Sequence, residues 1–159
     1  MWWTGDNNWM HFSDAVKDEV EYGLQLKPYV HPDCTAHHGP EDQGQKYPPE
    51  VYIRWVQFCS HGTIMRIHSD PSPCGHPETC TAARQPWAIG DQPHTEDVVR
   101  DFVQMRYKLL PTLVAAGARA SEDGMPLVRR LDLEWPELAA AGAARDDQYL
   151  LGDDTLVHS

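Results

Sequence analysis

The sequence predicts an α/β fold, and three observations support this prediction. Apolar residues recur at helical spacing in three segments: 9–24, 51–59 and 98–113. Short apolar stretches typical of strands lie between these helices, and the connecting loops are rich in Gly, Pro and polar residues. After Gly124 the pattern changes to short strands at 127–133, 149–151 and 155–157, with an Ala-rich stretch at 138–144.

The chain begins with a short aromatic strand that breaks at Gly5, so that Asp6 follows the strand directly. A side chain in this position projects from the C-terminal end of the strand, where (β/α)-barrels build their active sites. The helix expected next presents Trp9, Phe12, Val16, Val20 and Leu24 on one face, with Ser13 and Asp14 suited to its first turn.

A second strand is expected at 29–30, followed by a long loop over 31–49 that would lie over the barrel mouth. Pro48 and Pro49 then favour a helix start, because the N–H group that proline lacks is unpaired there. The apolar face of this helix includes Trp55, which is expected to lie in the core rather than to stack on a ligand.

A third strand is expected at 63–67, followed by an irregular stretch over 69–93. The last helix is expected to begin with Thr95 as its N-cap and to be kinked at Pro111. Arg54 and Arg106 are expected to pair with acids in the shell of the fold rather than to contact a ligand.

Taken in order, these segments resemble glycoside hydrolase family 31, the α-glucosidase and α-xylosidase family. The motifs that carry the resemblance include Trp3-Thr4-Gly5-Asp6-Asn7, Arg66-Ile67-His68 and Leu133-Glu134-Trp135-Pro136. The resemblance covers nearly the whole chain, but only the later part of the family's barrel and the first strands of its following β-domain. A complete barrel needs about 250 residues, more than the 159 present.

The resemblance therefore implies a partial (β/α)₈ TIM barrel, made of its last strands and helices, that runs into the first strands of a β-sandwich. The expected division is 1–125 for the barrel part and 126–159 for the start of the β-domain. On its own, such a piece leaves strand edges and apolar surface open. Its expected partners are a missing N-terminal half, or further copies of itself.

The chemistry implied is retaining hydrolysis of terminal α-glycosidic bonds in an oligosaccharide or α-glucoside, which needs two carboxyl groups and no metal or organic cofactor. By resemblance Asp6 is the acid/base, while Asp33 and His68 bind sugar hydroxyls. Without the resemblance, Asp6 and Asp33 would be ordinary turn residues and His68 a satisfied polar residue. The nucleophile belongs to an earlier strand that this sequence lacks, so the isolated chain is expected to be inactive.

Composition excludes other classes of partner. The net charge of −11, with basic residues scattered among more numerous acids, argues against nucleic-acid binding. The sequence contains neither the basic and apolar start of a signal peptide nor an apolar run long enough to cross a bilayer, so no membrane partner is expected. The compartment remains open.

Two alternatives remain. One is a zinc-binding module that draws its ligands from the segments 31–38 and 74–80, where potential N, O and S ligands gather: His31, Asp33, Cys34, His37, His38, Cys74, His76 and Cys80. Their spacing matches no standard zinc module. The other alternative is a truncated product without activity.

Overall fold

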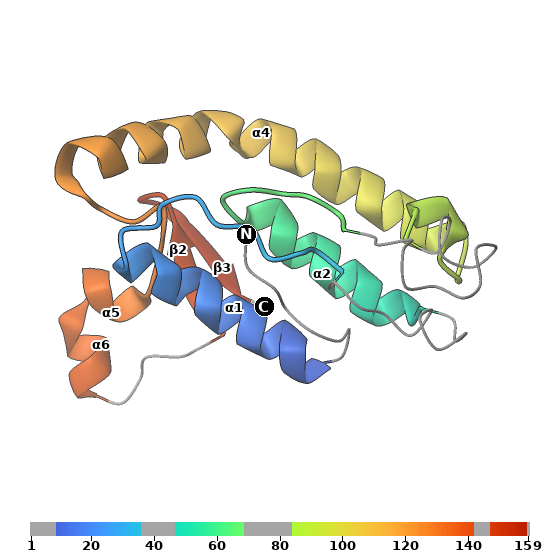
Figure 1. The fold of residues 1–159 in the computed structure, drawn as a ribbon, viewed down its shortest axis with the longest axis horizontal. Helices are drawn as coiled ribbons and strands as arrows, with labels where there is room; N and C mark the ends of the chain where they lie inside the picture. Colours follow the sequence, from blue (N-terminus) through green and yellow to red (C-terminus); the bar gives the residue numbers. More distant parts are fainter. Residues whose placement is uncertain (1–8, 36–46, 69–83, 142–146, 159) are drawn as a thin grey trace.

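The computed structural model describes residues 9–35, 47–68, 84–141 and 147–158. Helix α1 (Trp9–Leu24) lies against a small sheet of strands β1 (Val128–Arg129), β2 (Gln148–Leu151) and β3 (Thr155–His158), and helix α2 (Pro49–His61) packs against the long helix α4 (His94–Asp123) (Figure 1). Two short helices, α5 (Leu131–Glu134) and α6 (Pro136–Ala140), lie beside the sheet. The strand expected before Gly5 and the acid Asp6 lie outside the described residues. No helix in the described ranges combines the length and apolar character needed to cross a bilayer.

Helix α1 spans Trp9–Leu24, as its apolar periodicity predicts. Its inward face buries Phe12, Val16, Glu19 and Val20. The end of the helix packs against β1 so closely that a Cβ atom on Gly23 would lie 2.6 Å from the carbonyl oxygen of Val128.

Helix α2 spans Pro49–His61, and Pro49 occupies its first turn as expected. Trp55 is fully buried, with its ring centre 5.3 Å from that of Phe12 in an edge-to-face contact. Phe58 extends the aromatic cluster to Tyr149 of the sheet, at 6.4 Å between ring centres. The expectation that Trp55 belongs to the core is confirmed.

Helix α4 spans His94–Asp123 and follows a short 3-10 helix, η2, at Pro86–Ala88. Its N-cap is Pro93, so the expectation that Thr95 caps the helix is wrong: the Thr95 hydroxyl instead donates to the carbonyl oxygen of Gly90, at 2.9 Å. The helix continues through Pro111, and its axis bends along its length (Figure 1). It ends at Gly124, whose φ of 79° is a left-handed conformation that glycine adopts readily.

The strands expected at 29–30 and 63–67 are not regular strands. An isolated parallel bridge joins Ile67, in the second segment, to Cys34, which lies beyond the first segment in the stretch expected to be a loop. Pro28 and Pro32 flank the first segment and cannot donate to a strand ladder. The backbone N–H and carbonyl groups of Val30 bond instead to the Thr63 hydroxyl, at 2.8 and 2.6 Å.

The C-terminal part forms an antiparallel sheet in the order β1-β2-β3. Its strands are Val128–Arg129, Gln148–Leu151 and Thr155–His158, and Tyr149 pairs with Val157. The strand expected over 127–133 is confined to β1, because the chain turns into helix α5 at Leu131–Glu134, where two acids favour a first helical turn. Helix α6 follows at Pro136–Ala140.

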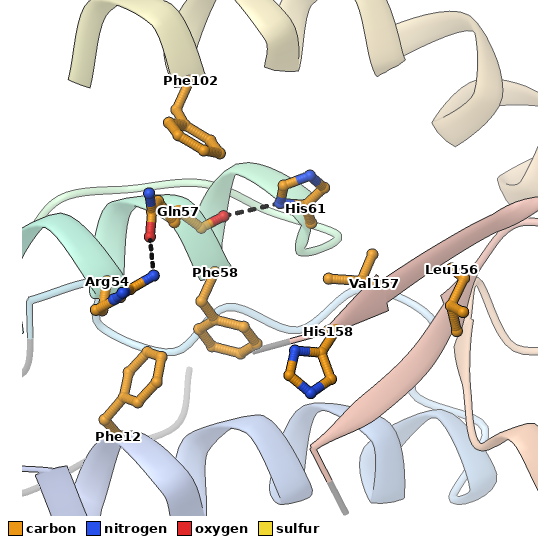
Figure 2. Close-up of a pocket in the computed structure, with 9 residues that line it drawn as sticks. All are labelled: Phe12, Arg54, Gln57, Phe58, His61, Phe102, Leu156, Val157 and His158. Carbon is orange, nitrogen blue, oxygen red and sulfur yellow. Dashed lines mark hydrogen bonds between the residues drawn. The ribbon is translucent and has the colours of Figure 1, made fainter. Parts of the chain in front are cut away.

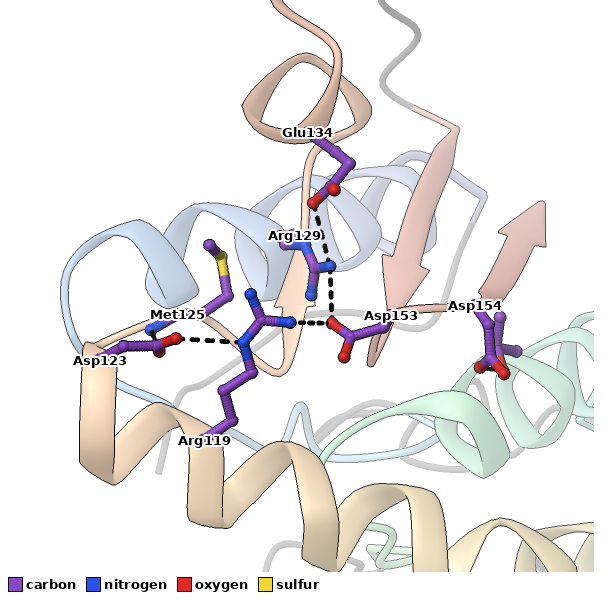
Figure 3. A network of polar contacts seen from close by, with 8 residues as sticks. Arg119, Asp123, Met125, Arg129, Glu134, Asp153 and Asp154 are labelled. Atoms are coloured by element: carbon purple, nitrogen blue, oxygen red, sulfur yellow. Dashed lines mark hydrogen bonds and ion pairs between the residues drawn. The ribbon is translucent and has the colours of Figure 1, made fainter.

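A network of charges ties this sheet to the end of α4 (Figure 3). Arg129, which is 2% exposed, contacts Asp153 at 3.0 Å and Glu134 at 3.1 Å. Arg119 of α4 also contacts Asp153, and it bonds to Asp123 at 3.1 Å. The turn between β2 and β3 is therefore held to both β1 and α4.

Candidate functional site

Asp33 and His68 lie on the two segments that meet at the bridge between Cys34 and Ile67. Asp33 precedes one bridge partner and His68 follows the other, and the amide of His68 donates to the carbonyl oxygen of Cys34 at 3.0 Å. The structure therefore brings two of the three expected site residues onto neighbouring segments. The third, Asp6, lies outside the described residues, so the convergence of all three stays a prediction.

Asp33 is 1% exposed and is held by an ion pair. Arg66 Nη2 donates to Asp33 Oδ1 at 2.6 Å, and His31 Nδ1 lies 3.7 Å from the same oxygen. This pairing follows from the register, because Arg66 and Asp33 each immediately precede a bridge partner. Burial of a carboxylate is costly unless it is paired, so Arg66 compensates the charge of Asp33.

His68 is anchored through its backbone. Its carbonyl oxygen accepts hydrogen bonds from the Thr35 hydroxyl at 3.3 Å and from Arg84 Nη1 at 3.0 Å. The main chain at this position is thus fixed by Thr35, next to the bridge partner Cys34, and by Arg84 from a further segment, while the residue itself is only half-buried.

A buried polar cluster lies behind these two segments, and the sequence analysis missed it. It is formed by Glu19 of α1, Thr63, Arg106 of α4 and Tyr149 of β2. Burial raises the pKa of Glu19 to about 7, while the hydrogen bonds from Thr63 and the charge of Arg106 act in the opposite direction. A signal was present in the sequence: Glu19 stands on the apolar face of its helix, between Val16 and Val20.

Arg54 and Arg106, which were expected to form ion pairs with acids, instead form hydrogen bonds with neutral groups. Arg54 donates to the side chain of Gln57, at 3.2 Å. Arg106 donates to backbone carbonyls, including that of Thr63 at 2.9 Å, and interacts with Glu19 only through its charge.

A cavity of about 370 Å³ lies between α1, α2, α4 and β3 (Figure 2). Aromatic, aliphatic and polar side chains line it: Phe12, Arg54, Gln57, Phe58, His61, Phe102, Leu156, Val157 and His158. Neither Asp33 nor His68 lines this cavity, so it is separate from the candidate sugar site.

The alternative zinc site loses one of its expected ligands. Cys34 forms a disulfide with Cys59 of α2, and its sulfur is therefore no thiolate ligand in this structure. Within the described ranges, no group of three or more His, Cys, Asp or Glu residues is placed to hold a metal ion. His37, His38, Cys74, His76 and Cys80 lie outside those ranges.

The chain matches a family model of glycosidases and curated relatives that are glycosidases. Residues 1–116 match the model of the glycosyl hydrolases family 31 TIM-barrel domain. The chain is 31% identical over 158 residues to human neutral alpha-glucosidase AB, and 34% identical over 110 residues to an alpha-xylosidase of Emericella nidulans. These matches cover 98% and 69% of the chain but only 15% and 12% of the relatives.

Solved structures show the same similarity. A family 31 dextranase of Flavobacterium johnsoniae, complexed with glucose, superposes with a TM-score of 0.80 at 25% identity, covering 98% of this chain and 19% of the dextranase. A cycloalternan-degrading enzyme of Trueperella pyogenes superposes with a TM-score of 0.78 at 26% identity, covering 99% of this chain and 22% of the enzyme.

Proposed function

The chain belongs to glycosyl hydrolase family 31, and from this we propose that it forms part of a retaining α-glycosidase, in which it supplies the acid/base and two sugar-binding side chains. The observation that carries the proposal is the junction at Cys34 and Ile67, which places Asp33 and His68 on adjoining parallel segments. Parallel neighbours end at the same edge, which in this fold is where active sites lie.

The proposed fold of the complete protein is a (β/α)₈ barrel whose last part spans 1–125, followed by a β-rich domain that begins within 126–159. Two features support this division. Extended segments alternate with α1, α2 and α4 up to Gly124, and the pairing changes from parallel to antiparallel after it. Such a change is typical of a boundary between a barrel and a sandwich.

In the proposed mechanism, Asp6 protonates the leaving glycosidic oxygen and later removes a proton from water. Retaining hydrolysis requires a second carboxylate as nucleophile, about 5–5.5 Å from the first. We propose that an earlier barrel strand provides it and that the isolated chain has no hydrolytic activity. The substrate class follows from the relatives, whose names include alpha-glucosidases and an alpha-xylosidase.

Asp33 and His68 would hold hydroxyl groups of the bound sugar. Arg66 engages Oδ1 of Asp33 and fixes the orientation of that carboxylate. A carboxylate accepts several hydrogen bonds, so Asp33 retains acceptor capacity for a hydroxyl donor. The anchored backbone of His68 would position its imidazole in the same way.

Two assays test the proposal. With an aryl α-glucoside, we expect no turnover by the chain or by its Asp6→Asn variant, and turnover that depends on Asp6 would contradict the proposed inactivity.

Calorimetry with a basic iminosugar should detect binding that His68→Ala abolishes. The control His158→Ala, which changes the separate cavity, should bind normally. Absence of heat with any sugar would remove Asp33 and His68 as ligands.

A further inference from the structure

Glu19 makes an unusual contact for a residue on the buried face of a helix. Its side chain is 2% exposed, and Oε1 accepts a hydrogen bond from the backbone N–H of Thr63 at 3.1 Å. The other oxygen, Oε2, is buried and has no hydrogen-bond partner among the described residues. Helix α1 thus directs a desolvated carboxyl group at the chain immediately after α2.

Thr63 joins this helix contact to the segment that carries Asp33. Its hydroxyl accepts from the N–H of Val30 at 2.8 Å and donates to the carbonyl oxygen of Val30 at 2.6 Å. Because a hydroxyl has one proton, the longer 3.4 Å approach to Glu19 is the weaker contact. The Thr63 side chain therefore forms hydrogen bonds with both backbone groups of Val30, which would bond to a neighbouring strand in a regular sheet.

Arg106 holds the same turn from the opposite side. Its Nη1 donates to the carbonyl oxygens of Ser60, at 3.2 Å, and of Gly62, and its Nη2 donates to that of Thr63 at 2.9 Å. The guanidinium group of Arg106 thus binds three carbonyl groups within four residues at the end of α2. These hydrogen bonds hold the start of the segment that leads to His68.

We propose that Glu19, Thr63 and Arg106 are positioning residues that set the placement of Asp33 and His68 relative to each other, and through it the affinity of the sugar site. The inference rests on the proposed function. Its basis is that, within the described residues, the two segments share one isolated backbone bridge. Side chains from α1, α4 and the turn therefore provide the pairing that a continuous strand ladder would give.

The test compares Thr63→Val, which keeps the shape and removes the hydroxyl, with Thr63→Ser, which keeps the hydroxyl. Thr155→Val is the matched control, because Thr155 lies on β3, where its hydroxyl contacts only the exposed Asp154 among the described residues. Two quantities are measured on the full chain: the affinity for a basic iminosugar, and the amide hydrogen exchange of His68, whose N–H bonds to Cys34.

We expect Thr63→Val to weaken iminosugar binding at least tenfold and to accelerate exchange at His68 at least tenfold, while exchange at Val99 in α4 stays unchanged. Thr63→Ser and Thr155→Val should resemble the wild type in both measurements. Arg106→Lys, which keeps the charge but lacks the planar fork, is a second variant that should change the same two quantities.

Wild-type exchange at His68 in both Thr63→Val and Arg106→Lys would overturn the inference. Equal acceleration at His68 and Val99 would overturn it too, because it would indicate general destabilisation. If the wild type binds no sugar, the proposed function fails, and the ratio of exchange at His68 to that at Val99 still decides the positioning role.

Discussion

Arg66 pairs with Asp33 across the junction of two extended segments, and the two side chains differ sharply in exposure. The Arg66 side chain is 42% exposed and that of Asp33 is 2% exposed, although their atoms lie 2.6 Å apart. Arg66 therefore links a buried carboxylate to the surface. Loss of the arginine would leave a buried carboxylate without its close charged donor, whereas the arginine itself is readily solvated.

We expect Arg66→Met to lower the free energy of unfolding by about 1–3 kcal/mol, measured by urea denaturation, because a buried acceptor loses its charged donor. The matched control is Arg100→Met. Arg100 pairs with Glu96 and Asp97 on the exposed face of α4, so its removal should change stability by less than about 1 kcal/mol. Equal effects of the two substitutions would contradict the interpretation of Asp33 as a buried ion-pair partner.

Glu19 should make stability depend on pH between about 4.5 and 7. Because burial raises its pKa from 4.5 to about 7, the folded state binds the proton more tightly than the unfolded state. The contribution of Glu19 to the free energy of unfolding is fully present below pH 4.5 and is lost as the pH rises through 7. At 1.36 kcal/mol for each pKa unit, this loss is about 3 kcal/mol.

The measurement is urea denaturation at a series of pH values, with Glu19→Gln compared with the wild type. The variant should lack this pH-dependent component. Glu21→Gln removes a carboxyl from the exposed side of the same helix and should retain the wild-type dependence. A wild-type profile in Glu19→Gln would show that another group titrates.

Asp153 should stabilise the junction between the sheet and α4, since it lies between Arg119 and the buried Arg129 (Figure 3). We expect Asp153→Ala to lower the free energy of unfolding by about 1–2 kcal/mol, because the charge of Arg129 loses one of the two carboxylates that it contacts in the described part of the chain. Asp154→Ala, in the same turn, is the control and should have little effect. Comparable losses in thermal denaturation of both variants would exclude a specific role for the network.

Two glycines offer a further comparison. A Cβ atom at Gly23 would meet the backbone oxygen of Val128 at 2.6 Å, so Gly23→Ala must displace β1 and should cost about 1–3 kcal/mol. At Gly117 the obstacle is the hydroxyl end of Tyr29, which is 55% exposed and free to rotate away. Gly117→Ala should therefore be tolerated better in chemical denaturation, and the opposite order would refute this argument.

The sequence analysis predicted the long helices well because their apolar periodicity is local. Helix α1 begins and ends where the spacing of Trp9 to Leu24 indicates, and Pro49 marks the start of α2. The length of the first C-terminal strand was overestimated: the expected strand spans 127–133, whereas β1 spans only 128–129. Nothing local in these residues indicates where pairing with β2 stops.

Other features depend on contacts between distant segments. Three contacts join residues that are far apart in the sequence: the bridge between Cys34 and Ile67, the ion pair between Asp33 and Arg66, and the disulfide between Cys34 and Cys59. Local sequence patterns cannot predict them, because they form only when the whole chain folds. Glu19 was missed because helical periodicity locates the buried face but does not explain an acid on it. Family resemblance pointed to Asp33 and His68, but not to the residues that support them.

The covalent bond between Cys34 and Cys59 determines how the chain must be produced for these experiments. It attaches the residue next to Asp33 to helix α2, and such bonds form and persist in oxidising environments and are rare in a reducing cytosol. We expect protein purified from a reducing cytoplasm to lack this attachment and to bind the iminosugar more weakly. Expression through a secretory route, with titration of free thiols before each assay, is therefore the appropriate preparation.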